Sequence, residues 1–547
     1  MGHPDPGSAP SLRPTGLTGV GWRELCDLVA AAPLAAPHDL VLTGVTADSR
    51  LVHPGDLYVA APGSVAHGAD FVPEAIRSGA GAVLTDAPGL ARVEAVPGQG
   101  PRIPVAVVER PRAMVPVLAD RIYQHPATRL HLFGITGTNG KTTTAYLLQA
   151  ALRAAGQRVG LIGTIGYQLD DRRIEGRRTT VTTPEAAELS ALLAVLAEQG
   201  ADSVVMEVSS HALALGRVEG LVFDVAAFTN FGSDHLDFHG DVASYFAAKA
   251  ALFTARHARR AVINADDPRG PGLIDRARTE GLVAVRSVSL DGSGDYAGRR
   301  RRAAGGGRTA ITATTPTGTL DVTLGLPGEF NVRNALTALA MADLAGVDLA
   351  RAATGLADAV VPGRMQRVPL GPGAPTVFVD FAHTPQAVGA VLAALAGHRR
   401  VVVLGCGGDR DPEKRGPMGA AAAAGAEVVI VTDDNPRSED PAAIRAQVLA
   451  GARSEAARSG RGGSEGREVV VRDGGQRRAA IVEALAAAGP DDVVAVLGKG
   501  HETGQEIAGR VLPFADDDVV REVWAGLSEP AAAGSTTADN SAGEGGR

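Results

Sequence analysis

The segment "RLHLFGITGTNGKTTTAYLLQAALRAAG", Arg129–Gly156, decides the predicted fold class. An apolar strand is followed by a glycine-rich turn and then by a helix in which Tyr146, Leu147 and Ala151 recur at helical spacing. Backbone N–H groups of a glycine turn at a helix N-terminus form a binding site for anions. The segment therefore predicts a phosphate-binding loop between a strand and a helix.

The turn itself, "GTNGKTT" at Gly137–Thr143, carries residue types that handle nucleotide phosphates. Lys141 is placed to neutralise charge on the β- and γ-phosphates, and Thr142 is placed to reach Mg²⁺. The usual spacing of such loops requires glycine at position 135, which is Ile135 here, so we interpret the loop as a shortened variant. The alternative is a plain glycine turn followed by a surface lysine, which the flanking strand and helix disfavour.

Length and composition bound the class of protein. The 547 residues indicate three domains, and 45% hydrophobic with 21% charged residues is typical of a globular chain. A net charge of −8 offers no broad attraction for nucleic acid or an anionic membrane. Two cysteines argue against a disulfide framework, and we find neither a secretory signal nor a run of about 18 apolar residues. We therefore expect a cytoplasmic protein without membrane insertion.

Strand and helix patterns alternate along most of the chain, which predicts an α/β fold with largely parallel sheets. The expected strands include "LYVAA", "RVGLIGT", "DSVVMEV", "DVAAF", "RRAVIN", "TVFVD", "RRVVVLG", "EVVIV" and "DVVAVLG". Polar stretches at both ends are expected to be disordered, and 454–468 to be a flexible insertion. The predicted boundaries are 1–17 disordered, 18–127 first domain, 128–363 second domain, 364–527 third domain and 528–547 disordered.

Almost every polar cluster follows directly after an apolar strand. These clusters are "GTNGKTT", "EVSSH", "TNFGSDH", "NADD", "DFAHTP", "GCGGDRD", "DDNPR" and "GKGHE". In open parallel sheets, ligands bind beyond the carboxyl ends of the strands. Because two predicted sheets carry such loops, we expect a site shared between two domains.

Two of these loops hold candidate Mg²⁺ ligands, Glu207 in "MEVSSH" and His235 in "GSDHLDFHG". Mg²⁺ prefers oxygen ligands, so the alternative that His235 only orders its loop stays open. Lys249 falls in the middle of an apolar helical face, four residues from both Tyr245 and Phe253. Burial there would lower its pKa. Either the side chain reaches the surface, or a neutral amine reacts with CO₂ to give a carbamate that ligates a metal.

The motifs "GTNGKTT", "EVSSH", "TNFGSDHLDFHG", "YFAAKAALF", "NADD", "PGEFNVRNALTALA", "VPGRMQ" and "DFAHTP" occur in the order seen in the Mur ligases. The chain resembles this family from Asp48–Arg50 to "GKGHE". The resemblance implies an N-terminal UDP-binding α/β domain, a central P-loop ATPase-like domain with a mostly parallel sheet, and a C-terminal Rossmann-like domain. Within the family it is similar to the ATP-dependent ligases that add meso-2,6-diaminopimelate to the D-glutamate side-chain carboxylate of UDP-N-acetylmuramoyl-L-alanyl-D-glutamate, in peptidoglycan synthesis.

The resemblance also implies which residues carry the phosphoryl chemistry. Lys141 is catalytic, and the implied Mg²⁺ ligands, also assigned to catalysis, are Thr142, Glu207, His235 and Lys249 as a CO₂-derived carbamate. The implied ATP contacts are Gly137, Thr138, Asn139, Gly140, Lys141, Thr142, Thr143, Asn264, Asn331, Asn334, Arg364 and Asp380. Of these, Arg364 suits the γ-phosphate as it transfers, and Asp380 suits the ribose hydroxyls.

Contacts to the other two substrates follow from the same resemblance. The UDP-precursor contacts are Ser49, Ser64 in "GSVAHG", Thr182, Thr183, Ser210 and Arg217. The chain departs from some relatives at Leu215, where a glutamine is common, and at Val181. The diaminopimelate contacts are Arg410, Asp434, Asn435, Arg437, Gly498 and Glu502. No role is assigned to Asp473–Ile481, because "DGGQRRAAI" loosens a compact Asp-Arg motif.

The stretch "TDDNPRSED", Thr432–Asp440, is expected to select the incoming amino acid. Arg437 can fork onto a carboxylate, while Asp434 and Glu502 favour an ammonium group. Lysine lacks the distal carboxylate of diaminopimelate, so bound lysine would leave Arg437 unpaired, and we expect that penalty to reject it. The alternative is an ordinary turn with an internal Asp434–Arg437 pair.

The implied reaction converts the carboxylate into an acyl phosphate, which the incoming amine then attacks. His211 and His383 either relay a proton or only orient their neighbours. We expect a monomer that closes to exclude water. Three alternatives compete with this prediction. A lysine-adding Mur ligase is disfavoured by the intact "DNPR", and a folylpolyglutamate synthase lacks a UDP-binding domain. A nucleotide-binding regulator without ligase activity is disfavoured by Glu207, His235, Lys249 and the amino-acid contacts.

Overall fold

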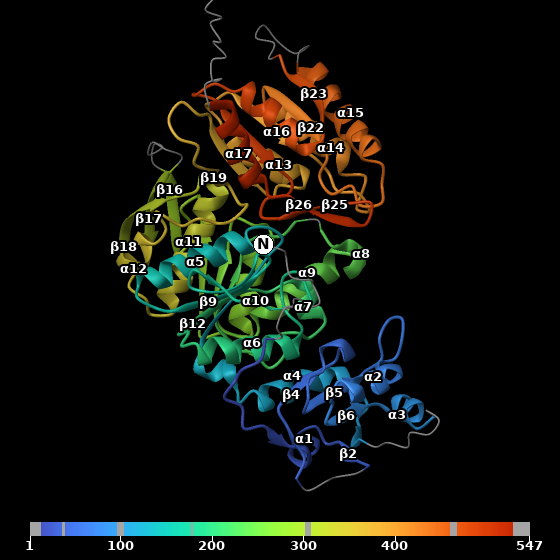
Figure 1. The fold of residues 1–547 in the computed structure, drawn as a ribbon. Helices are drawn as coiled ribbons and strands as arrows, with labels where there is room; N and C mark the ends of the chain where they lie inside the picture. The colour runs from blue at the N-terminus through green and yellow to red at the C-terminus, as the bar shows by residue number, and fades with distance from the viewer. Residues whose placement is uncertain are drawn as a thin grey trace, which may run out of the picture. The chain divides into compact units, whose positions relative to one another are not determined.

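The computed structural model describes residues 12–34, 39–95, 103–176, 179–232, 234–300, 308–459 and 468–528. The chain divides into two compact units, Met1–Val361 and Pro362–Arg547. Among the described residues, unit 1 contains two large sheets and a two-stranded one, and unit 2 contains a six-stranded sheet and a hairpin, so we describe each unit by itself (Figure 1).

The first sheet of unit 1 has five short strands in the order β2-β7-β6-β5-β4. Their bounds are Ala32–Pro33 (β2), Gly44–Thr46 (β4), Asp56–Ala60 (β5), Ala82–Thr85 (β6) and Val105–Val107 (β7). Alternate residues of β5 enter two apolar clusters: Leu57 and Val59 pack with helices α1 (Trp22–Leu28) and α4 (Pro111–Ile122), and Tyr58 packs with α2 (Val72–Arg77) and α3 (Ala87–Glu94). Side chains of a strand alternate between faces, so this sheet is covered on both sides.

The second sheet of unit 1 has eleven strands, and its centre is parallel. The order is β11-β10-β9-β12-β8-β13-β14-β15-β16-β17-β18, with parallel pairing from β9 through β16. The strands are β8 (His131–Thr136), β9 (Val159–Gly163), β10 (Gly166–Leu169), β11 (Arg172–Arg173), β12 (Ser203–Glu207), β13 (Phe223–Phe228), β14 (Ala258–Asn264), β15 (Ala284–Ser289), β16 (Tyr296–Arg300), β17 (Thr309–Thr315) and β18 (Gly318–Leu324). The α/β prediction is confirmed, whereas the antiparallel edge formed by β17 and β18 was not predicted.

Most of the predicted site loops connect the strands of this sheet to the helices that pack on it. Helix α5 follows β8 after the turn 137–140 and packs against α11 and α12. The helices are α5 (Lys141–Ala154), α6 (Ala186–Glu198), α7 (Ser210–Ala214), α8 (Leu236–His239), α9 (Val242–Ala250), α10 (Gly270–Thr279), α11 (Glu329–Leu344) and α12 (Leu349–Thr354). Ten residues of α5 are buried, so this helix is held from all sides and its N-terminus is fixed beside β8.

Unit 2 is a six-stranded sheet in the order β19-β20-β24-β21-β22-β23, parallel except for β19. The strands are β19 (Gln366–Val368), β20 (Thr376–Asp380), β21 (Arg400–Leu404), β22 (Val428–Thr432), β23 (Val470–Gly475) and β24 (Val493–Leu497), and a separate hairpin pairs β25 (Gly504–Ile507) with β26 (Arg510–Pro513). The helices are α13 (Pro385–Ala394), α14 (Arg415–Gly425), α15 (Pro441–Ser459), α16 (Arg477–Ala486) and α17 (Asp516–Ser528).

Two segments expected to lack structure are in part ordered. Helix α15 continues to Ser459, six residues into the expected insertion, whose residues 460–467 lie outside the described part of the chain. Near the N-terminus, Arg13 donates to Asp56 and Tyr123, and the backbone N–H groups of Thr15 and Gly16 donate to Glu198. Residues 1–11 and 529–547 lie outside the described residues.

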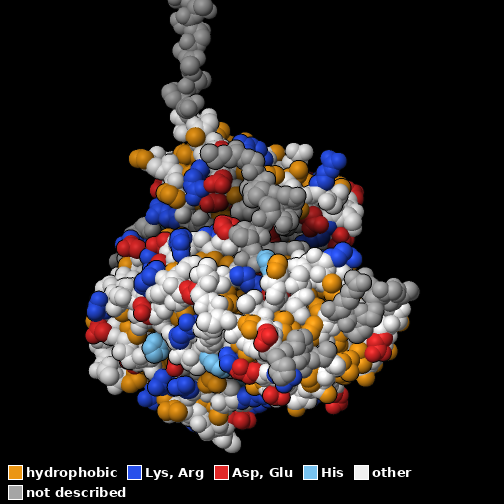
Figure 2. All heavy atoms as spheres, turned by 60° about the horizontal axis from the view of Figure 1, so that its bottom comes forward, with side chains coloured by type: hydrophobic (Ala, Val, Ile, Leu, Met, Phe, Trp, Pro, Cys, Tyr) orange, Lys and Arg blue, Asp and Glu red, His pale blue; other side chains and the backbone are white. Residues whose placement is uncertain are grey.

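Charged side chains of both signs lie on the surface. On the face drawn in Figure 2, Lys and Arg side chains are interspersed with Asp and Glu. Among the described helices, none combines the length and the apolar character needed to cross a membrane.

Candidate active site

The phosphate loop has the backbone shape that its glycines predict. Gly137 and Gly140 have φ angles of 152° and 85°, and α5 begins immediately after at Lys141. A Cβ added at Gly140 would lie 2.7 Å from Oδ1 of Asn334, and one at Gly137 would lie 1.9 Å from Oγ1 of Thr229. Both positions therefore require glycine for conformation and for space.

Neighbouring loops brace this turn from its sides. The Asn139 N–H donates to Oδ1 of Asn230 at 2.9 Å, and Oγ1 of Thr229 donates to the Asn139 carbonyl at 2.6 Å. Lys141 Nζ donates to the carbonyls of Gly137 at 2.8 Å and Thr138 at 3.0 Å. The lysine thus lies over the loop, with its charge at the place where a bound anion would sit.

A carboxylate and a hydroxyl meet beside the start of α5. Oγ1 of Thr142 donates to Oε2 of Glu207 at 2.9 Å, and Glu207 also accepts from the N–H and Oγ1 of Thr164 at 2.8 and 3.0 Å. Glu207 is only 1% exposed. This pair supplies the oxygen ligands that Mg²⁺ prefers, so these two predicted ligands fit the ion. Within the described residues, no three His, Cys, Asp or Glu side chains gather as a metal-binding group.

Lys249 is buried against the phosphate loop. Its side chain is 1% exposed, its Nζ donates to the Gly137 carbonyl at 2.9 Å, and it lies 4.6 Å from the ring centre of Tyr245. Burial, together with the nearby charge of Lys141, lowers the pKa of Lys249 to about 6. The alternative that this side chain reaches the surface is therefore wrong, and near neutral pH its amine is largely unprotonated.

His235 lies in a cluster of aromatic rings over the same region. Its ring centre is 4.8 Å from that of His211 and 6.1 Å from that of Tyr245, and its side chain is 46% exposed. Partial burial, with Lys141 and Lys249 nearby, lowers the pKa of His235. The neutral imidazole is the form able to ligate a metal. Its backbone φ of 51° is unusual for a residue other than glycine.

The remaining predicted ATP contacts fall into two groups. In unit 1, Asn264, Asn331 and Asn334 are buried: Asn264 Nδ2 donates to the Thr229 carbonyl at 2.7 Å, and Asn334 Nδ2 donates to Oδ1 of Asn331 at 3.2 Å. Asn334 also lies against Gly140, as described above, so the structure brings it to the phosphate loop.

The other two predicted ATP contacts belong to unit 2. Asp380 accepts hydrogen bonds from the N–H groups of Met365 at 2.6 Å and Ala382 at 2.8 Å. Burial raises the pKa of Asp380, and Arg364 opposes that shift. The Arg364 guanidinium stacks over the Phe381 ring at 4.3 Å. Its role toward a γ-phosphate stays a prediction.

Four of the predicted UDP-precursor contacts lie close together. Oγ1 of Thr183 donates to the Glu207 carbonyl at 2.9 Å, and Nη1 of Arg217 donates to the Thr183 carbonyl at 3.3 Å. Thr182 lies 3.2 Å from Thr164, another neighbour of Glu207. Ser210 follows Ser209, whose hydroxyl is 3.3 Å from Oγ1 of Thr183, and the Ser210 hydroxyl lies 3.0 Å from Nε2 of His239. This group therefore adjoins Glu207, a predicted Mg²⁺ ligand.

The other two lie in the first sheet and its loops. Ser49 donates to Oε2 of Glu74 at 2.7 Å and is 7% exposed, whereas Ser64 is exposed in its loop. The departure at Leu215 places a side chain that is 51% exposed two residues before Arg217.

In unit 2, four predicted amino-acid contacts meet at the ends of β22 and β24. Nδ2 of Asn435 donates to Oε2 of Glu502 at 2.8 Å. Gly498 has a φ of 110°, and a Cβ there would lie 2.6 Å from Oδ2 of Asp434. The close approach explains why glycine is needed at this position. Asp434 and Asn435 are both more than nine-tenths buried.

Arg437 has partners within unit 2 in the absence of an amino acid. Its Nη1 donates to the Gly408 carbonyl at 2.6 Å, and its Nε lies 3.2 Å from Oε2 of Glu506. The alternative of an internal pair between Asp434 and Arg437 is wrong, because Asp434 instead lies 3.9 Å from the guanidinium of Arg477. Arg410 is exposed on the neighbouring loop after β21.

Sequence reasoning missed a layer of charge beneath these residues. Arg477 and Asp516 are fully buried and form a bidentate pair at 2.7 Å in both hydrogen bonds, and Lys499 is buried between Asn435 and Glu502. Arg477 lies in the segment to which no role was assigned. The motif "GKGHE" itself contained a signal for Lys499, since a lysine between two glycines directly follows a buried strand.

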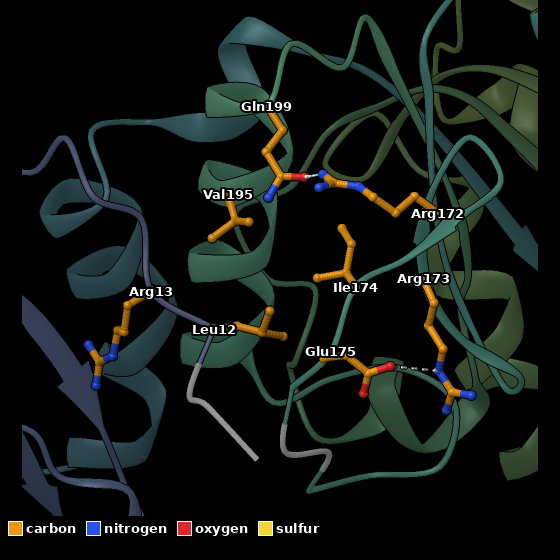
Figure 3. Close-up of a pocket in the computed structure, with 8 residues that line it drawn as sticks. All are labelled: Leu12, Arg13, Arg172, Arg173, Ile174, Glu175, Val195 and Gln199. Carbon is orange, nitrogen blue, oxygen red and sulfur yellow. Dashed lines mark hydrogen bonds and ion pairs between the residues drawn. The ribbon is translucent and has the colours of Figure 1, made fainter. Parts of the chain in front are cut away.

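A separate cavity of about 230 Å³ lies elsewhere in unit 1 (Figure 3). Three apolar residues, Leu12, Ile174 and Val195, line part of it, and the rest of the lining is polar or charged: Arg13, Arg172, Arg173, Glu175 and Gln199. Arg172 is hydrogen-bonded to Gln199. None of the predicted site residues lines this cavity.

Comparison with known proteins agrees with this arrangement. Family models match three consecutive segments: Mur ligase family, catalytic domain (41–123), Mur ligase middle domain (135–342) and Mur ligase, glutamate ligase domain (363–500). Two curated relatives, from Streptomyces avermitilis and Streptomyces coelicolor, are named UDP-N-acetylmuramoyl-L-alanyl-D-glutamate--2,6-diaminopimelate ligase. Each is 46% identical, over 93% of this chain and 97% of the relative.

Solved structures give the same result for the fold. A structure of a UDP-N-acetylmuramoyl-L-alanyl-D-glutamate--2,6-diaminopimelate ligase aligns with a TM-score of 0.66 and 30% identity, over 93% of this chain and 99% of that chain. A Mycobacterium tuberculosis folylpolyglutamate synthase aligns with a TM-score of 0.55 and 23% identity, over 71% of this chain and 92% of that chain, and shows a shared fold alone. With three family models in chain order and relatives at 46% identity over nearly their whole length, the chain belongs to the Mur ligase family.

Proposed function

We propose that this ligase uses ATP to join meso-2,6-diaminopimelate to the D-glutamate side-chain carboxylate of UDP-N-acetylmuramoyl-L-alanyl-D-glutamate. The observation that carries the proposal is the group of Asp434, Asn435, Arg437 and Glu502 at the strand ends of unit 2, which offers both signs of charge in one place. An amino acid with a second ammonium and a second carboxylate matches such a group.

The first step is phosphoryl transfer. A carboxylate oxygen of the substrate attacks the γ-phosphorus of ATP, the bond to the β,γ-bridging oxygen breaks, and ADP leaves with an acyl phosphate formed. Lys141 and the N–H groups at the start of α5 bind the phosphates and stabilise the charge on the transferring group. Thr183 and Arg217 orient the precursor beside Glu207.

Mg²⁺ would be held by Thr142 and Glu207, with His235 and a carbamate on Lys249 as further ligands, and would supply charge neutralisation for the phosphates. The low pKa of Lys249 supports the carbamate, because only an unprotonated amine reacts with CO₂. In the alternative, His235 only orders its loop and is not a ligand.

The second step forms the amide. The amine of the incoming amino acid attacks the carbonyl carbon, the bond to the phosphate oxygen breaks, and the nitrogen loses a proton. Asp434 and Glu502 attract the distal ammonium group, and Arg437 and Arg410 attract the distal carboxylate. We infer that the protein works as a monomer in the cytoplasm, where nucleotide-linked precursors and ATP are available.

Phosphate release tests this function. Purified protein is incubated with ATP, Mg²⁺, UDP-N-acetylmuramoyl-L-alanyl-D-glutamate and either meso-diaminopimelate or L-lysine. We expect release that depends on meso-diaminopimelate. Equal release with lysine would favour a lysine-adding ligase, and no release with either amino acid would favour a nucleotide-binding regulator.

A further inference from the structure

Lys499 is a fully buried cation beneath the amino-acid group of unit 2. Its side chain is 0% exposed, and it lies between Gly498 and Gly500, whose φ angles are 110° and 54°. The space around Gly500 is filled as well, since a Cβ there would lie 2.7 Å from the Gly363 carbonyl. This backbone turns the lysine inward at a position where an ammonium group needs nearby acceptors.

Three acceptors from three segments surround the Lys499 ammonium. Nζ donates to Oδ1 of Asn435 at 3.2 Å, to Oε2 of Glu502 at 3.1 Å and to the Gly504 carbonyl at 2.6 Å. An ammonium group has three donor hydrogens, so these acceptors use its full capacity. The lysine therefore ties the loop after β22 to the loop after β24 and to the first residue of β25.

These contacts decide which way the Asn435 amide faces. The backbone N–H of Glu506 donates to Oδ1 of Asn435 at 2.9 Å, so two donors point at this atom and it must be the oxygen. The amide nitrogen consequently faces Glu502. Asn435 is thereby presented as a donor on the side where the amino acid is proposed to bind.

The same contact sets the position of Glu502. Its Oε2 accepts from both Lys499 and Asn435, and its side chain is about one-third exposed. Oε2 is thus held by two buried donors, which orients the carboxylate group toward the exposed side. A carboxylate held in this way is prepared to accept an ammonium hydrogen of a ligand.

We propose that Lys499 is a positioning residue for the amino-acid substrate, acting through Asn435 and Glu502. It fixes the donor on Asn435 and the acceptor on Glu502 in the geometry that a group with both an ammonium and a carboxylate requires. This inference rests on the proposed function, because it concerns the amino acid that the same group binds. Lys499 itself is enclosed by protein atoms and contacts the substrate only through these two side chains.

The test is steady-state kinetics of Lys499→Met, which keeps the length of the side chain and removes its charge and its donors. We expect the KM for meso-diaminopimelate to rise about tenfold or more, as for a lost hydrogen bond to a charged group, while the KM for ATP stays within about twofold. The double variant Lys499→Met with Asn435→Ala should have nearly the KM of Asn435→Ala alone, because each change by itself already removes the interaction between Lys499 and Asn435. Fully additive effects would overturn the positioning role.

Two further measurements separate this inference from stability and from the proposed function. Lys414→Met, another lysine of unit 2, should leave both KM values unchanged. If Lys499→Met fails to fold, Lys499→Gln retains a donor for the Gly504 carbonyl and takes its place; unfolding of both variants would assign Lys499 to stability and overturn the inference.

A wild-type protein that ignores meso-diaminopimelate defeats the proposed function, whereas a wild type that uses it and a variant with unchanged KM defeat only the role of Lys499.

Discussion

Nζ of Lys249 lies 2.9 Å from the carbonyl oxygen of Gly137, so a buried lysine of α9 contacts the first residue of the phosphate loop. An uncharged amine at this place can be converted into an anion next to bound nucleotide, and Thr142 and Glu207 lie on the same loop and the adjacent strand end. Lys249→Ala should therefore lower kcat by about 100-fold or more, as for loss of one electrostatic group in a reaction centre.

A short carboxylic acid such as acetate should restore part of the Lys249→Ala activity, because it replaces the lost anion. Lys141→Ala is the matched control: it also removes a lysine from the loop, but acetate should not restore it, since Lys141 acts as a cation. Absence of rescue in Lys249→Ala would contradict the carbamate.

The shape of the phosphate loop predicts a specific effect of Gly140→Ala. The positive φ angle should cost about 1–2 kcal/mol of stability, and the new Cβ would press on Asn334, so the KM for ATP should rise as well. Gly397→Ala is the control, because Gly397 also has a positive φ but its Cβ would meet open space. Gly140→Ala should lose at least as much stability as Gly397→Ala, measured by urea unfolding, and only Gly140→Ala should change the KM for ATP.

The buried pair of Arg477 and Asp516 predicts a large effect on stability. Arg477→Ala leaves the Asp516 carboxylate buried without its partner, which should cost about 3–5 kcal/mol in the free energy of unfolding of unit 2. The adjacent Arg478 pairs with Glu522 at the surface, so Arg478→Ala should cost less than about 1 kcal/mol. Equal effects in denaturant titrations would show that burial of the pair is unimportant.

The Cys406 thiol predicts a dependence of stability on pH. Burial raises the pKa of Cys406 to about 12, from an ordinary value of 9.0. Between these two values the unfolded chain releases the proton and the folded chain keeps it, so the stabilising contribution is complete below pH 9 and is lost as the pH rises toward 12. We expect the Cys406→Ala variant to lose less stability than the wild type between pH 8.5 and 10. A thiol reagent at pH 8 should label Cys406 only after unfolding.

The sequence predicted those parts of the fold and site that depend on local pattern. The strands around the phosphate loop, the turn at Gly137–Thr143 and the place of Lys249 on an apolar helical face follow from apolar periodicity and from residues next to one another in the chain, whereas the burial of Lys249 was left open. The polar clusters at strand ends were found for the same reason, since each directly follows an apolar run.

The missed features depend on contacts between distant segments. Lys499 is separated from Asn435 by 64 positions, and Arg477 from Asp516 by 39, so neither pair leaves a local pattern. The hairpin of β25 and β26 supplies Glu506, so the ion pair between Glu506 and Arg437 was not foreseen from the sequence. Tertiary packing decides such contacts, and periodicity along the chain carries little information about them.

Arg437 provides the most direct test of the proposed selection of the amino acid. The measurement is the ratio of kcat/KM for meso-diaminopimelate to that for L-lysine, in the wild type and in Arg437→Ala. Glu506 and the Gly408 carbonyl hold Arg437 in a fixed position for the distal carboxylate, which lysine lacks. Because lysine forgoes this hydrogen bond between charged groups, we expect a wild-type ratio of about 100-fold. Arg437→Ala should reduce that ratio to about tenfold or less while leaving the KM for ATP unchanged. A wild-type ratio near one, or a ratio that the substitution leaves intact, would contradict the proposal that this site selects diaminopimelate.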